Sequence, residues 1–135
     1  MAVDQRSAIE REIRVEARPE TVFEFFTDPE KMTRWMGREA EIDPRPGGAY
    51  RIDIVGHVAV GEYVEIDRPH RLVMTWTFGD DPSNVQLIEL SLSESEGSTT
   101  VLLVNSGIST DERRGAQDWG WRGCLDELDR ALAGP

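Results

Sequence analysis

The hydrophobic positions near the end of the chain recur at helical spacing. Within residues 109–132, Trp121, Leu125, Leu128 and Leu132 lie three or four positions apart, with polar residues between them. This spacing places the four side chains on one face of an α-helix. Because such a stripe must be buried, we expect the helix to lie across the sheet that the rest of the chain forms.

The first half of this helix differs from the second. Ser109 and Glu112 match the spacing of a capping box, which satisfies free amide donors at a helix start. Gly115, Gly120 and Gly123 each cost about 1 kcal/mol relative to alanine. They indicate either a close approach of the backbone to a neighbouring element or a half of the helix that moves. The second half contains no glycine, and we expect it to be the firmly packed end.

Upstream of this helix, the pattern predicts mainly short strands. Residues 9–17 alternate between apolar and charged side chains, as in a strand with one solvated face. A turn follows at DPRPGG, residues 43–48, and short polar connections then separate five more strand-like runs. Such short connections are typical of an antiparallel meander. The five runs cover residues 50–55, 57–66, 71–78, 84–92 and 99–106.

Two short helices are predicted between the first strand and the turn. Pro19 is suited to the first position of one helix. Asp28 is placed to cap the other, directly ahead of Pro29. The apolar positions of the second helix, at i, i+3 and i+4, are Met32, Trp35 and Met36.

Several strand positions break the simple alternation. Between residues 57 and 66, Glu62 shares its parity with four apolar residues, so the pattern does not decide which face points inward. Arg11 lies on the apolar side of the first strand, and Glu89 is in phase with two apolar neighbours. A charge that faces a core needs a partner or water. An Arg11–Glu89 pair is one interpretation, and solvated positions near the strand ends are the simpler one.

Composition narrows the class of protein. A chain of 135 residues is expected to form a single domain, here with its core at residues 9–132, since domains of this size bury roughly 68% of their unfolded surface. The net charge of −11 argues against nucleic acid and against anionic membranes as partners. Cys124 is the only cysteine, which excludes an intramolecular disulfide and favours a reducing compartment. The amino terminus lacks the apolar core of a signal peptide, and no run is long enough to span a bilayer. We therefore expect a soluble, cytoplasmic protein.

Several segments, in their order and spacing, carry a resemblance to a known family. They are REI (11–13), TDPEKMTRW (27–35), PGGAYR (46–51), GEYVEIDRPHRLVMTW (61–76) and GWRGCLDEL (120–128). Over residues 9–132 the chain resembles the START-like helix-grip superfamily, also called SRPBCC. Within it, the chain is similar to the branch related to the activator of the 90-kDa heat-shock chaperone ATPase. The resemblance implies an α+β fold: a curved antiparallel sheet of six or seven strands, two short helices, and a long C-terminal helix packed across the sheet.

The resemblance also implies a cavity between the sheet and the last helix, of a kind that suits small apolar molecules. It does not decide an activity, because members include lipid carriers, cyclases, hydrolases and chaperone activators. The chain departs from the family at two positions. Many relatives carry tryptophan where Phe23 stands and histidine near Asn105, so polar roles at those positions are not carried over.

Large aromatic side chains either pack a core or line a ligand chamber, and both interpretations stay open here. Trp76 and Trp121 are the strongest candidates for the chamber, because the helix and the sheet must face each other there. Trp119 lies roughly 200° around the helix from Trp121, so the two cannot share a face, and Trp119 fits a cavity mouth or a subunit contact. The residues expected to contact the ligand are Phe26, Trp35, Tyr50, Ile52, Met74, Trp76, Phe78, Leu103, Gln117 and Trp121.

The sequence predicts neither a metal site nor a cofactor. His57 and His70 fall at turns, nothing near them has metal-ligand spacing, and the single cysteine is most simply a small core residue. Serine, histidine and aspartate do not fall into a spacing that indicates a nucleophile. Asp53, Glu62 and Asp118 would serve as a general acid or base only if buried. In so acidic a chain, solvated positions are the simpler interpretation.

Three functions remain open. The leading hypothesis is a protein that binds a small apolar or aromatic ligand in the cavity. The second is a protein-interaction module whose acidic surface docks onto a chaperone, as the resemblance to chaperone activators implies. The third is an enzyme, such as a cyclase or hydrolase, which would need a titratable group pointing into the cavity. The sequence also leaves open whether the chain forms a homodimer.

Overall fold

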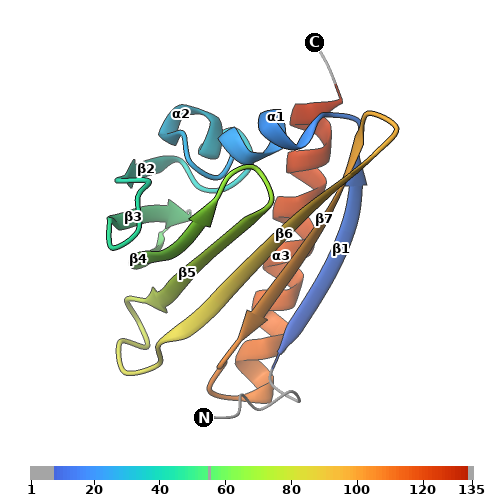
Figure 1. Ribbon diagram of the computed structural model, residues 1–135. Helices are drawn as coiled ribbons and strands as arrows, with labels where there is room; N and C mark the ends of the chain where they lie inside the picture. The colour runs from blue at the N-terminus through green and yellow to red at the C-terminus, as the bar shows by residue number, and fades with distance from the viewer. Residues whose placement is uncertain (1–7, 55, 134–135) are drawn as a thin grey trace.

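The computed structural model describes residues 8–54 and 56–133 (Figure 1). Residues 1–7, in which no apolar signal-peptide core was predicted, and Val55, at the end of the predicted strand 50–55, lie outside the described residues. The elements in chain order are β1 (Ile9–Val15), α1 (Pro19–Glu24), α2 (Pro29–Met32), β2 (Glu39–Ile42), β3 (Ala49–Ile54), β4 (His57–Asp67), β5 (Arg71–Phe78), β6 (Gln86–Ser95), β7 (Ser98–Ser106) and α3 (Asp111–Leu132).

The seven strands form one antiparallel sheet in the order β1-β7-β6-β5-β4-β3-β2. In Figure 1, α3 lies behind β6 and β7 and beside β1, whereas β3, β4 and β5 extend away from it. The short helices α1 and α2 lie together at one end of the sheet. The predicted α+β helix-grip fold is therefore confirmed, with β2 as a short strand that the pattern did not indicate. Among the described residues, no helix has the length and apolar character needed to cross a membrane.

The predicted apolar stripe of α3 is buried and packs against the sheet. Its four members, Trp121, Leu125, Leu128 and Leu132, are between 0% and 7% exposed. The start of the helix differs from the prediction by one residue. Thr110, rather than Ser109, is the N-cap, and its hydroxyl accepts a hydrogen bond from the Arg113 N–H at 3.1 Å. Ser109 instead donates a hydrogen bond from its hydroxyl to the Asp81 carboxylate at 3.1 Å. Either hydroxyl suits an N-cap, and the contact with Asp81 engages the hydroxyl of Ser109.

The glycines of α3 do not mark a close backbone approach. A Cβ atom built on Gly115, Gly120 or Gly123 would meet no heavy atom within 4 Å. That part of the prediction is wrong, because these positions face open space. Gly61 in β4 does mark a close backbone approach, because a Cβ atom at this position would lie 2.3 Å from the Thr75 carbonyl oxygen.

We therefore expect the same substitution to have opposite effects at these two sites. Gly115→Ala should raise the free energy of unfolding by about 0.5–1 kcal/mol, since it restricts the unfolded chain and improves helix propensity. Gly61→Ala should lower it by more than that, because β4 and β5 must separate to admit the methyl group. Urea denaturation followed by tryptophan fluorescence measures both changes. Equal effects of the two substitutions would contradict this interpretation.

A β-bulge explains why the pattern of residues 57–66 gave no inward face. The register of β4 against β5 shifts between Tyr63 and Glu65. Before the bulge, Ala59 and Tyr63 are buried at 0% and 1% exposure, and beyond it Ile66, of the opposite parity, packs against the core. One inserted residue thus reverses the alternation within a single strand.

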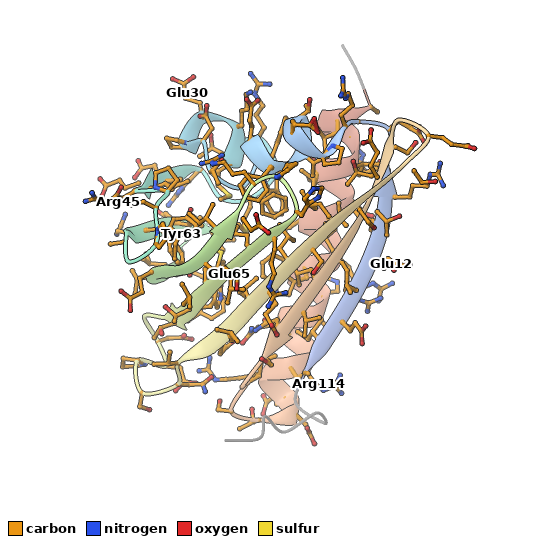
Figure 2. The ribbon with its side chains drawn as sticks, in the orientation of Figure 1. Glu12, Glu30, Arg45, Tyr63, Glu65 and Arg114 are labelled. Carbon is orange, nitrogen blue, oxygen red and sulfur yellow. The ribbon has the colours of Figure 1, made fainter. Side chains whose placement is uncertain are left out.

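The Arg11–Glu89 pair, the less favoured of the two interpretations, does not form, because the two side chains lie on opposite faces of the sheet. Arg11 reaches α3, where its guanidinium donates to both carboxylate oxygens of Asp118 at 2.7 and 2.6 Å. Glu89 accepts from Arg71 at 2.9 Å, and Arg71 also approaches Glu65 at 3.3 Å. Figure 2 shows Glu65 on the green part of the sheet, to the left of α3. The inward side of β6 belongs instead to the opposite parity, namely Gln86, Ile88, Leu90 and Leu92.

Candidate functional site

A hollow of about 960 Å³ lies between residues 113–126 of α3 and the ends of β3, β4 and β5. We use "the hollow" for this space throughout. It opens where α3, which covers the β1–β7–β6 side of the sheet, does not extend over β3, β4 and β5 (Figure 1). On the sheet side it is lined by Met36, Ile54, His57, Trp76, Phe78 and Asp80. On the helix side it is lined by Arg113, Ala116, Gln117, Trp119, Gly120, Trp121, Arg122, Gly123, Cys124 and Asp126.

The helix side of the hollow is a second stripe along α3, next to the buried one. Arg113, Ala116, Gly120 and Cys124 recur three or four positions apart, which places them along one line of the helix surface. Gly120 lies near the middle of this line, and no heavy atom lies within 4 Å of where its Cβ would be. The absence of a side chain at this position thus contributes directly to the open volume.

The ten residues predicted to contact a ligand divide into two groups. Trp76, Phe78, Gln117 and Trp121 line the hollow. Phe26, Trp35, Tyr50, Ile52, Met74 and Leu103 lie in the hydrophobic core, each at most 4% exposed. The structure therefore brings together only the members near the glycine-containing half of α3. Alternation indicates that a strand residue points inward, but it does not tell which part of the inward face the helix covers.

The floor of the hollow is aromatic. The Trp76 ring centroid lies 5.5 Å from that of Trp121 and 5.7 Å from that of Phe78, the latter in an edge-to-face arrangement. Both tryptophans are buried, with 2% and 6% exposure, whereas Trp119 is 78% exposed at the mouth. The prediction that Trp119 and Trp121 occupy different faces of the helix is confirmed.

One hydrogen bond to a group of three side-chain amides holds the Trp121 indole in place. The Asn105 side-chain carbonyl accepts hydrogen bonds from Trp121 Nε1 at 3.0 Å and from Gln117 Nε2 at 2.9 Å. The Gln86 carbonyl accepts from Gln117 Nε2 at 2.8 Å and from Asn105 Nδ2 at 2.9 Å. We call Gln86, Asn105 and Gln117 the amide cluster. It joins β6, β7 and α3 beside the hollow and satisfies polar groups that would otherwise be buried without partners.

Sequence reasoning did not select Gln86 or Asn105. A signal was nevertheless present, because each has the parity of apolar residues on its strand: Gln86 shares the parity of Ile88, and Asn105 that of Leu103. Gln86 is 2% exposed and Asn105 is 0% exposed. A polar residue in the apolar phase of a strand indicates a buried polar contact, although the partner on α3 cannot be identified from the strand alone.

Cys124 is the one nucleophilic side chain whose pKa is shifted in the wall of the hollow. Burial, and to a lesser extent the charge of Glu127, raises the pKa of the thiol from 9.0 to about 11. The thiol is therefore neutral at physiological pH, and its weak nucleophilicity fits a wall residue.

This pKa predicts slow alkylation of Cys124. At pH 8, which is below the pKa of the thiol in both the unfolded and the folded protein, the thiolate population of the folded protein should be about a hundredfold smaller than that of the unfolded chain. The rate of reaction with iodoacetamide should accordingly be about two orders of magnitude lower when folded, and it should rise until the pH reaches about 11. Mass spectrometry of timed samples, with and without urea, measures both rates. Equal rates in the two states would contradict the prediction.

The three carboxylates considered for acid–base chemistry do not line the hollow. Asp118 pairs with Arg11, whose hydrogen bond lowers the pKa of that carboxyl. Asp53 accepts the Gly56 N–H at 3.0 Å, and this bond is the main cause of its lowered pKa. Glu62 is exposed on β4. Of the histidines, His57 lies at the edge of the hollow and His70 lies at an exposed turn. Within the part of the chain that the structure describes, histidine, cysteine and acidic side chains form no group that could hold a metal ion.

Comparison with known proteins gives the family. The model of the family described as "Activator of Hsp90 ATPase homolog 1-like protein" (AHSA1) matches residues 16–133. The chain belongs to the AHSA1 family. This result confirms the resemblance to the chaperone-activator branch of the helix-grip superfamily that the sequence motifs indicated.

Two solved structures illustrate the range of AHSA1-like proteins. CalU16 from Micromonospora echinospora is 27% identical, with a TM-score of 0.78 over 95% of this chain and 76% of its own. PFC0360w, an HSP90 activator from Plasmodium falciparum, is 26% identical, with a TM-score of 0.80 over 95% of this chain and 97% of its own. Among curated sequences, uncharacterized protein C1711.08 from Schizosaccharomyces pombe is 25% identical over 93 residues, or 68% of this chain. The matched region is 27% of that longer protein.

Proposed function

We propose that this AHSA1-like protein binds a small apolar or aromatic ligand in the hollow between α3 and β3–β5. The observation that supports the proposal most directly is a space of about 960 Å³ with an aromatic floor. Pockets for small molecules measure about 300–1,000 Å³ and combine apolar walls with a few placed polar groups. Gln117, at the end of the amide cluster, is such a group.

The expected affinity follows from the apolar area that a ligand would bury. A ligand with two fused aromatic rings that buries about 250 Å² gains roughly 6 kcal/mol at 25 cal/mol per Å². Ordering costs reduce this value, so a dissociation constant in the upper micromolar range is expected for a simple aromatic probe. A physiological ligand that also uses the polar groups would bind more tightly.

Phenylalanine substitutions at two glycines of α3 test the proposal. Gly120→Phe places a ring in the hollow, whereas Gly115→Phe places the same ring on the exposed surface, and neither Cβ meets an atom within 4 Å. The neutral dye Nile red serves as the probe, with binding measured by its fluorescence. Gly120→Phe should weaken binding at least about fivefold, because it removes volume that the probe occupies. Gly115→Phe should leave the affinity as it is in the original protein.

The alternative outcomes are distinct. If the original protein does not bind Nile red, and native mass spectrometry of gently purified protein shows no bound small molecule, the ligand-binding proposal is wrong. If both phenylalanine variants weaken binding equally, the dye binds elsewhere and the hollow is not the site.

A second candidate function is the activation of an Hsp90-type chaperone. It is favoured by the similarity to PFC0360w, whose description is an HSP90 activator and which this chain matches over nearly its whole length. The net charge of −11 would favour a partner with a basic surface. Addition of this protein to a purified Hsp90-type ATPase tests the candidate. A rise in ATP hydrolysis that high salt suppresses would support it, and an unchanged rate over a wide range of protein concentration would reject it.

A further inference from the structure

Of the four tryptophans, all of which lie in the described part of the chain, only Trp119 is exposed. Its side chain is 78% exposed, whereas the other three are between 2% and 6% exposed. An indole presents about 150–250 Å² of largely apolar surface. Aromatic side chains are enriched at protein–protein interfaces, and apolar surface that continues into a hollow marks an interaction site. Packing within the described chain does not explain the position of this side chain.

The helix around Trp119 lets its ring protrude. On a helix surface, the neighbours of a residue lie three and four positions away. For Trp119, three of these four positions hold Gly115, Ala116 and Gly123. Glycine is unfavourable in a helix interior, and a Cβ atom built on either of these two glycines would meet no heavy atom within 4 Å. The indole therefore stands clear of side chains that would otherwise cover it.

The hollow next to Trp119 is complementary to such a ring. Its floor of Trp76, Phe78 and Trp121 offers aromatic faces and edges, which favour contact with another aromatic ring. Trp119 contributes to the mouth, but it lies roughly 200° around the helix from Trp121, so it cannot reach the floor of its own hollow. A two-fold axis removes this restriction, because each copy then presents its protruding indole to the hollow of the other.

The charges around the hollow also suit a second copy of the chain. Its lining contains two arginines, Arg113 and Arg122, and two aspartates, Asp80 and Asp126, so this face is balanced although the chain carries a net charge of −11. Arg113 lies 3.5 Å from Asp80. Within residues 8–54 and 56–133, Arg122 and Asp126 form no ion pair. Because residue i contacts j and j contacts i across a two-fold axis, Arg122 of one copy and Asp126 of the other can pair twice.

We propose that two copies of this chain form a reversible dimer in which Trp119 of each copy inserts into the hollow of the other. Two inserted indoles and the surfaces they cover amount to roughly 600–1,000 Å², below the lower limit of about 1,200 Å² for stable complexes. The dimer is therefore weak, with a dissociation constant of about 10–100 µM. A ligand in the hollow and Trp119 of a second copy exclude each other. The inference goes beyond the proposed function, because self-association would regulate access to the site.

Two variants test the inference separately and as a mixture. Trp119→Ala removes the protruding ring and keeps the hollow, whereas Gly120→Phe fills the hollow and keeps the ring. Sedimentation velocity at physiological salt, where the Debye length is about 8 Å, measures self-association over a wide range of protein concentration. Each variant alone should dimerise at least about twentyfold more weakly than the original protein, since both insertions are lost. The mixture restores one insertion and should associate at least about fourfold more tightly than either variant alone.

Val85→Ala is the control for a general loss of exposed apolar surface. Val85 is 62% exposed and does not line the hollow, so this variant should dimerise as the original protein does. A monomeric original protein at every concentration would overturn the inference. It would also be overturned if the mixture associated no more tightly than the separate variants, or if Gly120→Phe dimerised normally, because Trp119 would then not occupy the hollow.

Competition with Nile red relates the dimer to the proposed ligand. A saturating amount of the dye should shift the original protein towards the monomer, because dye and indole occupy the same space. A dimer that binds the dye and keeps its dissociation constant would overturn the inference and leave the ligand-binding function standing. If the dye does not bind at all, the ligand-binding proposal is wrong, and the mixture of the two variants still decides whether Trp119 inserts into the hollow.

Discussion

Asn105→Ala is expected to lower the free energy of unfolding by about 2–4 kcal/mol. The substitution removes an acceptor for Trp121 Nε1 and Gln117 Nε2 and a donor to Gln86. Gln117 and Gln86 keep their bonds to each other, but the Trp121 indole loses its one acceptor in a position with 6% exposure. A buried donor left without a partner costs about 1–3 kcal/mol, and the small cavity adds to this cost.

Urea denaturation monitored by tryptophan fluorescence measures the change, with Asn84→Ala as the matched control. Asn84 is the partly exposed neighbour of the cluster, accepting from Gln86 at 3.1 Å and donating to the Gly107 carbonyl at 2.7 Å. Water replaces those contacts easily, so this control should change stability by less than about 1 kcal/mol. A similar decrease in the free energy of unfolding of the two variants would show that the amide cluster contributes no more to stability than the exposed contacts of Asn84.

Asn105→Ala should also increase the mobility of the Trp121 side chain at the floor of the hollow. Trp121 is held by one hydrogen bond and by its contact with Trp76, whose ring centroid lies 5.5 Å away. Once the hydrogen bond is lost, the indole gains rotational freedom, which weakens a rigid binding surface. Loss of Nile red affinity in the folded variant is therefore expected together with the loss of stability.

Leu128→Ala is expected to have an effect of similar or greater size, about 2–5 kcal/mol. Leu128 is 0% exposed and lies in the glycine-free half of α3 that packs against the sheet. Removal of its side chain leaves a cavity between tightly packed elements, and the surroundings can collapse only partly. The predicted role of this half as the firmly packed end depends on such residues.

Leu102→Ala is the control for this second prediction. Leu102 is a half-buried residue of β7, on the face opposite its buried neighbours Val101 and Leu103. Its truncation should therefore lower the free energy of unfolding much less. Thermal and urea unfolding of the two variants provide the comparison. Since Leu128 does not line the hollow, its variant should bind Nile red normally below the unfolding transition. Equal destabilisation by the two substitutions would contradict the prediction that the glycine-free half of α3 is the firmly packed end.

Elements with strong periodicity were predictable because their pattern reports one simple fact, which is whether a side chain faces a core. The spacing of Trp121, Leu125 and Leu128 identified both the helix and its buried face. The alternation in residues 9–17 identified the inward side of β1. Errors arose where an additional residue or a competing hydroxyl changed the local geometry. The bulge after Tyr63 reversed the phase of β4, and Thr110 capped α3 in place of Ser109.

The candidate site was only partly predictable, and the reason is distance along the chain. The pattern selected Trp76, Phe78, Gln117 and Trp121 among ten candidates, and these four line the hollow. It did not show that Arg11 would pair with Asp118, 107 residues away, or that Gln86 would meet Gln117, 31 residues away. Such contacts depend on where α3 crosses the sheet, a quantity that no local window contains.

Local patterns along this chain were thus sufficient for the succession of strands and helices apart from β2, for the buried stripe of α3 and for the family. Tertiary packing alone decided which half of the sheet α3 covers, and with it the position of the hollow and the closure of the amide cluster. The physical reason is that periodicity records the environment of each residue averaged over one element. The placement of one element over another is decided by contacts between residues that lie far apart in the chain.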